Sequence, residues 1–161
     1  MIVYQAGLCD YVGTLTAKAD ESANIVRPEA KHIITKLAQH YRLGVISKTK
    51  NPDARIHELQ ALPFACYFQH IQTCREKNEE VVAAALKGLQ VGGIECWVVD
   101  DRIRNFPPFR KAGCTTIWLR DGVYATEEPE NEYEQPQHII TSLAGLLPLL
   151  LPSRRDQYKA L

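Results

Sequence analysis

Short apolar runs alternate with longer amphipathic segments along most of this chain. Each apolar run ends at a polar residue or a glycine, as buried strands do; the runs are 2–9, 43–46, 64–71, 95–99 and 114–119. The segments between them carry apolar residues at helical spacing or open with a proline or a capping asparagine, and predict helices at 28–40, 52–60, 78–89, 107–113 and 139–150. Regular alternation of this kind is typical of a parallel sheet with helices on both faces. The pattern therefore predicts an α/β fold, a three-layer α/β/α, Rossmann-like, doubly wound parallel sheet of about five strands.

Two polar stretches interrupt the alternation, and both are predicted to be loops. They are 16–24 and the acidic, proline-containing stretch 127–137. Neither is long enough to form a second domain, and 161 residues is the size of one ordinary domain. We therefore expect a single domain over residues 1–152, followed by a tail at 153–161.

Composition and charge argue against several classes of partner. The 19 basic and 19 acidic residues give a formal net charge of zero, which does not favour nucleic-acid binding. The N-terminus lacks the pattern of a signal peptide, and the longest apolar stretch, 143–151, is too short to cross a bilayer. The five cysteines form no C-x-x-C pair and suit reduced thiols. We expect a cytoplasmic protein with no nucleic-acid or membrane partner.

Polar side chains stand where the predicted strands end. Asp10 follows the first strand, Ser47 the second, and Asp100 and Asp101 the fourth, while Lys77 precedes a predicted helix. Because the carboxyl ends of parallel strands meet along one edge of the sheet, these groups are able to converge. Paired carboxylates need a cation or a shared proton, and Mg²⁺ prefers such oxygen ligands. The alternative is structural: two turns, a cap and a solvated lysine.

The same positions carry a resemblance to a known family. The segment 10–15, with the sequence DYVGTL, resembles the first motif of the haloacid dehalogenase (HAD) superfamily, D-x-D-G-T-L. Ser47 fits the family's second motif, Lys77 the third, and the segment 99–101, VDD, the fourth in its Asp-Asp form. Each motif is short, but their order and spacing are specific and cover nearly the whole chain. The resemblance implies a capless, phosphatase-like hydrolase with a Rossmann-like fold.

Phosphoryl chemistry at a magnesium ion is what this resemblance implies. Asp10 would be the nucleophile, attacking phosphorus to give an aspartyl-phosphate. Mg²⁺ would be held by Asp10, the backbone carbonyl of Val12, and Asp100 or Asp101, with water completing the octahedron. Only one member of the Asp-Asp pair is expected to bind the metal directly.

Three residues are candidates for binding the substrate. By the resemblance, Ser47 would donate a hydrogen bond to a phosphoryl oxygen, and Lys77 would place a compact positive charge on the same oxygens and on Asp10. Arg102 follows the paired acids and is suited to binding a substrate anion, although a solvated loop arginine explains it equally well.

The chain departs from the family at the second residue after the nucleophile. Phosphatases of the family carry a general acid and base, Asp, at this position, and this chain has Val12. General acid–base catalysis contributes about 10² to 10⁴ in rate, so its loss is expected to be felt. A further family Asp, four or five residues beyond the first acid of the fourth motif, is also replaced, by Asn105 or Phe106.

Two hypotheses of different classes follow. The first is a Mg²⁺-dependent phosphohydrolase acting through an aspartyl-phosphate, on substrates such as acyl or aryl phosphates whose leaving group needs little protonation. The second is a catalytically weak or inactive module that binds a phosphorylated ligand or a protein partner. An open, capless site suits either a phosphorylated small molecule or a phosphoprotein. A receiver-like domain is disfavoured, since in receivers the acid pair precedes the acceptor Asp.

Overall fold

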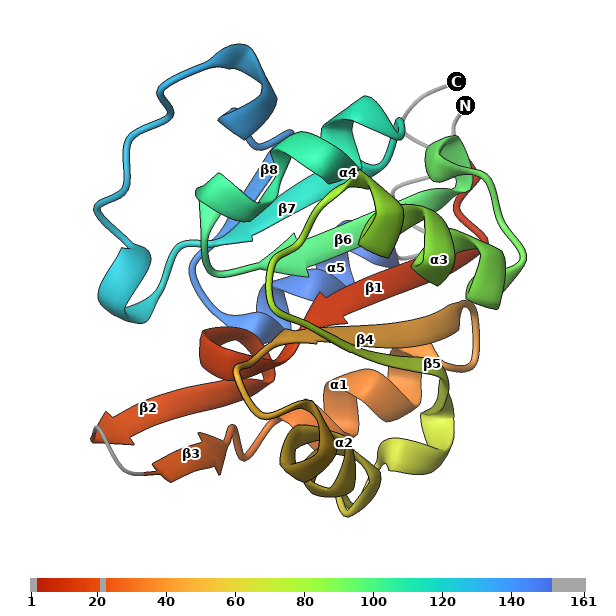
Figure 1. Cartoon of the computed structure of the whole chain (residues 1–161), viewed down its shortest axis with the longest axis vertical. Helices are drawn as coiled ribbons and strands as arrows, with labels where there is room; N and C mark the ends of the chain where they lie inside the picture. Colours follow the sequence, from red (N-terminus) through yellow and green to blue (C-terminus); the bar gives the residue numbers. More distant parts are fainter. Residues whose placement is uncertain (1–2, 21–22, 152–161) are drawn as a thin grey trace.

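Six parallel strands form the central sheet of the computed structural model, which describes residues 3–20 and 23–151 (Figure 1). The strands are β1 (Ala6–Asp10), β4 (Arg42–Lys48), β5 (Phe68–Cys74), β6 (Cys96–Asp100), β7 (Thr115–Leu119) and β8 (His138–Ile140). They are arranged in the order β5-β4-β1-β6-β7-β8, so β1 lies between β4 and β6. The predicted α/β, Rossmann-like fold is confirmed.

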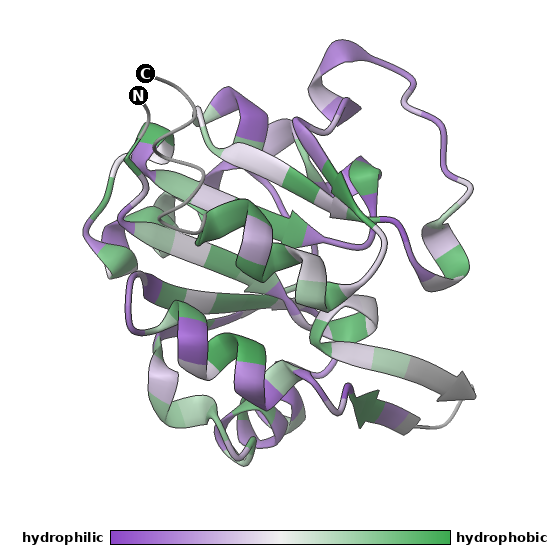
Figure 2. Cartoon of the chain, turned by 180° about the vertical axis from the view of Figure 1, so that it is seen from behind, coloured by the Kyte–Doolittle hydropathy of each residue, from purple (hydrophilic) through white to green (hydrophobic). Residues whose placement is uncertain are grey.

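Helices cover both faces of this sheet, as the alternating pattern predicted. They are α1 (Ala30–Leu37), α2 (Pro52–Gln60), α3 (Glu79–Leu89), α4 (Pro107–Lys111) and α5 (Leu146–Leu150). Buried residues of α1 and α5 form one core cluster with the strands, and those of α3 and α4 form another on the opposite face. Figure 2 shows hydrophobic residues gathered in the strands and the helices that cover them, with hydrophilic residues in the connections.

Alternation along the strands explains why one sheet supports two cores. In β6, Trp97 and Val99 pack into the cluster that contains α1, while Cys96 and Val98 pack into the cluster that contains α3. Successive side chains of a strand point to opposite faces, and a strand buried on both faces is apolar throughout. The continuous apolar runs in the sequence are therefore those of central strands.

The stretch 16–24 forms strands, and its prediction as a loop is wrong. A helical turn, Tyr11–Leu15, follows β1 and leads into an antiparallel hairpin of β2 (Thr16–Asp20) and β3 (Ala23–Val26). The hairpin lies apart from the main sheet and projects beyond the carboxyl end of β1 (Figure 1). Because the hairpin is not part of the sheet that is buried on both faces, its strands lack the continuous apolar run that identified the other strands.

The predicted helix at 139–150 is also wrong in its first half. Residues His138–Ile140 form β8, which pairs with β7 at the edge of the sheet, and α5 begins only at Leu146. This strand makes the sheet six-stranded instead of five-stranded. The third predicted strand, 64–71, is displaced, since Phe64 precedes a short turn and β5 begins at Phe68. The predicted tail at 153–161 lies outside the described residues.

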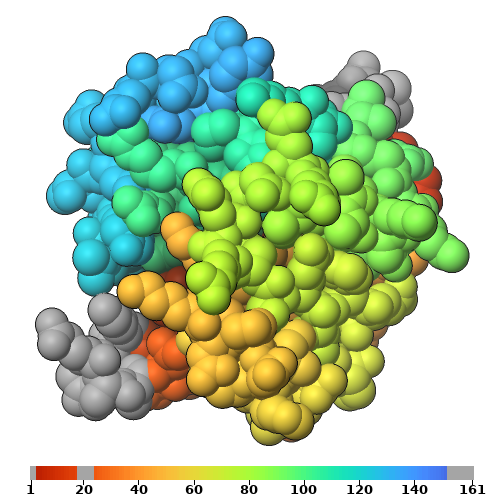
Figure 3. Space-filling view, viewed as in Figure 1, coloured from red at the N-terminus to blue at the C-terminus, as the bar shows by residue number. Residues whose placement is uncertain are grey.

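The stretch 127–137 is irregular, as predicted, apart from a short 3₁₀ turn at Glu132–Glu134. In a space-filling view (Figure 3), the cyan and blue residues that follow β7 form the upper left of the face shown, and orange residues lie lower on the same face. No helix in 3–20 or 23–151 is long and apolar enough to cross a membrane.

A glycine in β1 makes room for the largest buried side chain. Trp97 is fully buried, and a Cβ on Gly7 would lie 2.0 Å from its indole ring. Trp97 in turn meets the Tyr41 ring edge-on, with 5.8 Å between the ring centroids. The β1–β6 pairing therefore depends on the absence of a side chain at position 7.

We expect Gly7→Ala to lower the free energy of unfolding by about 1–3 kcal/mol or more, because Trp97 must move within a close-packed core. Urea denaturation measures the loss. Gly92→Ala is the matched control, since its Cβ would meet nothing closer than 3.5 Å, and it should change stability by less than about 0.5 kcal/mol. Equal stability of the two variants would refute this account of the β1–β6 contact.

Candidate active site

The candidate site lies at the carboxyl ends of the three central strands. Asp10 ends β1 and Asp100 ends β6, and Ser47 follows Ile46, the residue of β4 that pairs with Asp10. Lys77 comes from the connection between β5 and α3. The strand order places β4, β1 and β6 side by side, and this adjacency brings residues distant in sequence to one edge.

Lys77 joins two of the strand ends. Its ammonium Nζ lies 2.6 Å from Asp10 Oδ1 and 2.6 Å from Asp100 Oδ2, and its side chain is only 1% exposed. The next residue, Asn78, accepts a hydrogen bond from the backbone N–H of Val81 and caps α3, which fixes where the preceding lysine stands. Burial opposes the charge of Lys77, yet the two carboxylates raise its pKa above the ordinary value.

Asp10 is buried and bonded on both oxygens. Thr14 Oγ1 donates a hydrogen bond to Asp10 Oδ2 at 3.1 Å, while Lys77 holds Oδ1. Burial raises the pKa of Asp10 to about 6, the Lys77 charge opposes this shift, and the Asp100 charge adds to it. Lys77 and Thr14 therefore favour the ionised form of Asp10 against the effect of burial.

Asp100 serves as an anchor for its neighbours. Besides Lys77, it accepts a hydrogen bond from the backbone N–H of Arg102 at 3.0 Å, and both of its oxygens lie 3.0 Å from Asn105 Nδ2. Asn105 thus supports Asp100, at the position where the family often has another acid. Both oxygens of Asp100 are engaged by these partners.

Asp101 has a different environment. It is 6% exposed and lies against Gly13, where a Cβ would come within 2.1 Å of Asp101 Oδ2. Gly13 has a φ of +88°, a conformation that glycine adopts without strain. Burial, followed by the charges of Asp10 and Asp100, raises the pKa of Asp101 to about 8. Within the described part of the chain, no cation is paired with Asp101.

These groups fit a hard divalent cation. Oxygens of Asp10, Asp100 and Asp101 lie within 4.8 Å of one another, and all three residues are buried. When all three acids are ionised they carry three negative charges, and Lys77, the cation paired with them, compensates one. Two negative charges therefore remain uncompensated within this group. Carboxylate oxygens are the ligands that Mg²⁺ prefers. Asp101 is the acid of the Asp-Asp pair better placed to bind it, because Asp100 is paired with Lys77 and Asp101 is paired with no cation of the described residues.

Ser47 is held by a residue that the sequence did not indicate. Arg55 on α2 donates to Ser47 Oγ at 2.7 Å and to Glu58 at 2.9 Å, and its guanidinium lies 5.3 Å from the centroid of the Tyr11 ring. Because Ser47 Oγ accepts from Arg55, its own hydrogen is available to another acceptor. The helical pattern marked α2 without showing which of its charged residues faces the sheet.

Arg102 lies at the rim and is partly engaged. Its Nε donates to Glu127 at 2.9 Å, and its guanidinium lies 4.6 Å from the centroid of the Tyr124 ring. The second arginine after the acids, Arg104, is paired with Glu130 and Glu134 instead. The acidic stretch that was predicted as an exposed loop is thus tied to the arginines of the site.

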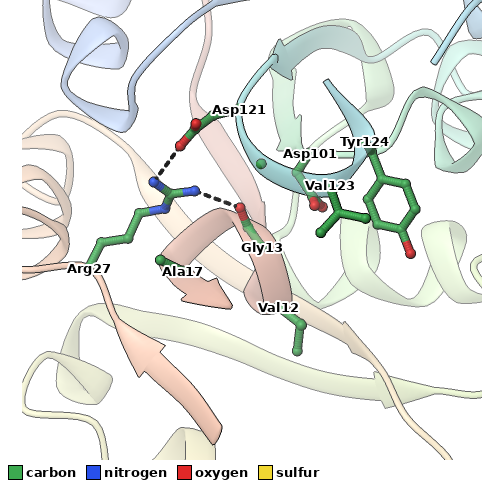
Figure 4. A pocket seen from close by; sticks show the side chains of 9 residues that line it. Val12, Gly13, Ala17, Arg27, Asp101, Asp121, Val123 and Tyr124 are labelled. Carbon is green, nitrogen blue, oxygen red and sulfur yellow. Dashed lines mark hydrogen bonds and ion pairs between the residues drawn. The ribbon is translucent and has the colours of Figure 1, made fainter. Parts of the chain in front are cut away.

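Two cavities adjoin at the candidate site. The smaller, about 150 Å³, is lined by Asp10, Val12, Lys48, Asp101, Arg102, Asn105 and Tyr124. The larger, about 270 Å³, is lined by Val12, Gly13, Ala17, Arg27, Asp101, Asp121, Gly122, Val123 and Tyr124 (Figure 4). Lys48, which directly follows Ser47, was not recognised from the sequence, although it is the last residue of a strand whose end was predicted to matter.

A search of family models and of curated proteins finds no match to this sequence. Solved structures do match. An uncharacterized protein from Listeria monocytogenes serotype 4b matches with a TM-score of 0.79 at 18% identity, over 91% of this chain and 97% of that one. The L-2-haloacid dehalogenase RSc1362 matches with a TM-score of 0.75 at 13% identity, over 92% and 99%. A HAD phosphatase from Thermococcus onnurineus matches with a TM-score of 0.66 at 19% identity, over 81% and 60%.

The likeness establishes the fold, which is that of haloacid dehalogenase-like hydrolases. The fold implied by the sequence resemblance is confirmed over most of the chain. Since the similar structures include a dehalogenase and a phosphatase, the fold leaves the reaction to be argued from the site.

The raised pKa of Asp101 predicts a pH-dependent stability in metal-free protein. A carboxyl whose folded pKa is about 8, against an ordinary value of 3.8, binds its proton more tightly when folded. Its contribution is therefore complete below about pH 4 and is lost as pH rises through about 8. In EDTA, we expect Asp101→Asn to become progressively more stable than the parent between pH 5 and pH 9.

Urea midpoints across this range measure the difference, and saturating Mg²⁺ should stabilise the parent most at high pH. Parallel curves for the parent and Asp101→Asn in EDTA would show that the carboxyl titrates at its ordinary pKa.

Proposed function

We propose that this protein is a Mg²⁺-dependent phosphohydrolase that acts through an aspartyl-phosphate on Asp10. The observation that carries this proposal is the buried group of three carboxylates, two of which are joined by Lys77. Burying three acids together is costly, so their presence around a single lysine calls for a function that uses them. A module that only binds a ligand has no need of both a nucleophile and a metal site.

The metal would be held by Asp10, the backbone carbonyl of Val12 and Asp101, with Asp100 in support. When bound, Mg²⁺ supplies positive charge that offsets the charge of the phosphoryl group approaching a carboxylate. Lys77 keeps Asp10 ionised and in place, and its own fixed position between two acids prevents it from swinging away. Asp100 acts through Lys77 and Asn105.

Three further side chains would bind the phosphoryl group in this proposal: Lys48 and Arg102 from the wall of the smaller cavity, and Ser47 from a buried position outside that wall. Ser47 has its oxygen held by Arg55 and its hydrogen free to donate. Lys48 and Arg102 line the smaller cavity beside Asp10 and carry positive charge. Preorganised donors of this kind stabilise charge that develops in a transition state. Arg102 would divide its donors between Glu127 and the substrate.

Val12 is the reason that we expect the rate of phosphate hydrolysis to be low. Its side chain lines both cavities where an acid would be needed, and it neither protonates a leaving group nor activates water. Both the loss of the leaving group and the hydrolysis of the intermediate therefore depend on solvent, and turnover is expected to be slow. The protein would act on a phosphorylated small molecule or a phosphoprotein, and buried free thiols such as Cys9 and Cys96 support a reducing, cytoplasmic setting.

Val12 also favours the second candidate function, a catalytically weak or inactive module. In that case Asp10, Ser47 and Lys48 would bind a phosphorylated ligand or protein partner without cleaving it. The two functions differ in whether Asp10 is consumed chemically, and this difference is measurable.

Hydrolysis of p-nitrophenyl phosphate and of acetyl phosphate tests the proposal directly. We expect the parent to hydrolyse both with Mg²⁺, and EDTA and Asp10→Asn to abolish the activity. Val12→Asp should raise it by about 10²-fold or more by restoring a general acid and base, the base being needed to activate the water that hydrolyses the intermediate. Asp53→Asn, an exposed acid on α2, is the control. If the parent and Val12→Asp are both inert while Mg²⁺ still binds, the binding-module function is favoured instead.

Calorimetry with Mg²⁺ separates the two acids of the pair. We expect Asp101→Asn to weaken Mg²⁺ binding by more than about tenfold. Loss of a residue that only supports a metal ligand already weakens metal binding by about tenfold or more, and loss of a ligand should weaken it further. Asp100→Asn should weaken it less, and should instead lower the free energy of unfolding because Lys77 loses a buried partner. The opposite ranking of the two variants in Mg²⁺ affinity would assign the metal to Asp100.

A further inference from the structure

The larger cavity has no part in the phosphoryl chemistry described above. It has a volume of about 270 Å³ and lies between the turn after β1, the hairpin strand β2 and the 3₁₀ turn at Gly122–Tyr124 (Figure 4). It shares Val12, Asp101 and Tyr124 with the smaller cavity that contains Asp10. The larger cavity therefore lies next to the position that a phosphorus atom would take at Asp10, with Val12 between the two cavities.

Two of the three charged side chains of this cavity are paired with each other, although Arg27 Nε has no hydrogen-bond partner among the described residues. Arg27 and Asp121 form an ion pair at 2.8 Å, and Arg27 also donates to the backbone carbonyl of Gly13 at 2.9 Å. Figure 4 shows both contacts at the wall of the cavity. The remaining charged group, Asp101, is negative when ionised. With Asp101 assigned to the metal and Arg27 paired with Asp121, the charged groups of this cavity have opposite charges beside them, and a neutral substituent suits it best.

The other walls are apolar. They come from Val12, Ala17 and Val123, together with the ring of Tyr124, which is held by the guanidinium of Arg102 at 4.6 Å. A cavity of about 150 Å³ accepts benzene, so about 270 Å³ holds a substituted aromatic ring. A neutral aromatic group therefore matches both the size and the chemistry of the cavity.

The lack of an acid at position 12 points to the same kind of group. Without a proton donor, a leaving oxygen must depart as an anion and be protonated by water afterwards. A phenol, with a pKa of about 10, departs far more readily than an oxygen whose pKa is close to the 15.7 of water. Phenolic oxygens are therefore the leaving groups that a site with Val12 releases most easily.

We propose that the larger cavity binds the aryl leaving group of an aryl phosphate monoester. The inference rests on the proposed function. An Asp10 oxygen forms a bond to phosphorus, the bond from phosphorus to the aryl oxygen breaks, and its electron pair leaves on that oxygen, which takes a proton from water. A second water then hydrolyses the aspartyl-phosphate, releasing phosphate and restoring the Asp10 carboxylate.

Free aryl phosphates and phosphotyrosine side chains share this chemistry. Val123 at the cavity is 70% exposed, so its mouth is open to solvent. A phosphotyrosine peptide and phenyl phosphate therefore form two arms of the test. Higher kcat/KM for the peptide assigns the source to a protein, and higher kcat/KM for phenyl phosphate assigns it to a small molecule.

The test compares the hydrolysis of phenyl phosphate with that of acetyl phosphate, which has no ring. Both are measured in variants whose larger side chain fills the cavity. We expect Ala17→Phe to lower kcat/KM for phenyl phosphate by about tenfold or more, the scale on which an apolar pocket discriminates, and to leave acetyl phosphate within about twofold. Val123→Trp, at an exposed position that does not risk the core, should act in the same direction. Ala83→Phe, on the exposed face of α3, is the matched control. Equal losses on both substrates would overturn the proposal.

Binding of phosphonates separates this proposal from the proposed function. Phenylphosphonate and methylphosphonate carry a P–C bond and are not hydrolysed, so calorimetry measures their affinities in the Mg²⁺-loaded protein whether or not it turns over. We expect phenylphosphonate to bind more tightly, and Ala17→Phe to remove the difference. If no phosphate is hydrolysed but this preference is present, the cavity is confirmed and the hydrolase is not. If acetyl phosphate is hydrolysed but the preference is absent, only the cavity is wrong.

Discussion

The ammonium of Lys77, buried between Asp10 and Asp100, is the contact on which the rest of the site depends. Carboxylates removed from water repel one another and lose their hydration, and a buried lysine left alone would shed its proton. Here one lysine, 2.6 Å from each of two acids, stabilises both strand ends at once. It is not paired with Asp101, whose pKa is raised by burial and then by the charges of Asp10 and Asp100. The surplus of negative charge, when all three acids are ionised, is the feature on which the proposed divalent-cation site rests, and the charge of Lys77 favours the ionised form of Asp10.

The sheet provides this arrangement at little cost because its three central strands are adjacent. Asp10 and Asp100 are the last residues of neighbouring strands, so no long side chain or distorted loop is needed to bring them together. The turn after β1 then brings Gly13 against Asp101, where no other residue leaves enough room. Position 12 therefore lies beside the acids whatever its side chain is. Val12 lines both cavities without offering an acid or a base, so its effect is expected in catalytic rate and in the choice of leaving group.

Much of this was predictable from the sequence, and the failures have physical reasons. Buried central strands are continuous apolar runs, so their ends were found, and with them the acids and Ser47. The β2–β3 hairpin has no such run, because it forms a separate two-stranded sheet and is not buried on both faces. The edge strand His138–Ile140 is short and runs directly into the apolar residues of the last helix, so the helical pattern concealed it. Arg55 and Lys48 were missed for another reason: their parts depend on which way a side chain points, and neither spacing nor residue type gives that direction.

The most direct test of the account is to trap the phosphoryl group on Asp10. The Mg²⁺-loaded protein is mixed with acetyl phosphate, quenched in acid, digested, and analysed by mass spectrometry for the peptide that contains Asp10. Because Val12 provides no base for hydrolysis, the intermediate is expected to accumulate, and the account predicts one added phosphoryl group on Asp10 that disappears in EDTA. The contradicting result is that the protein binds Mg²⁺ tightly or turns over acetyl phosphate, and Val12→Asp turns it over faster, but no phosphoryl group is found on Asp10. Asp10 would then not be the nucleophile.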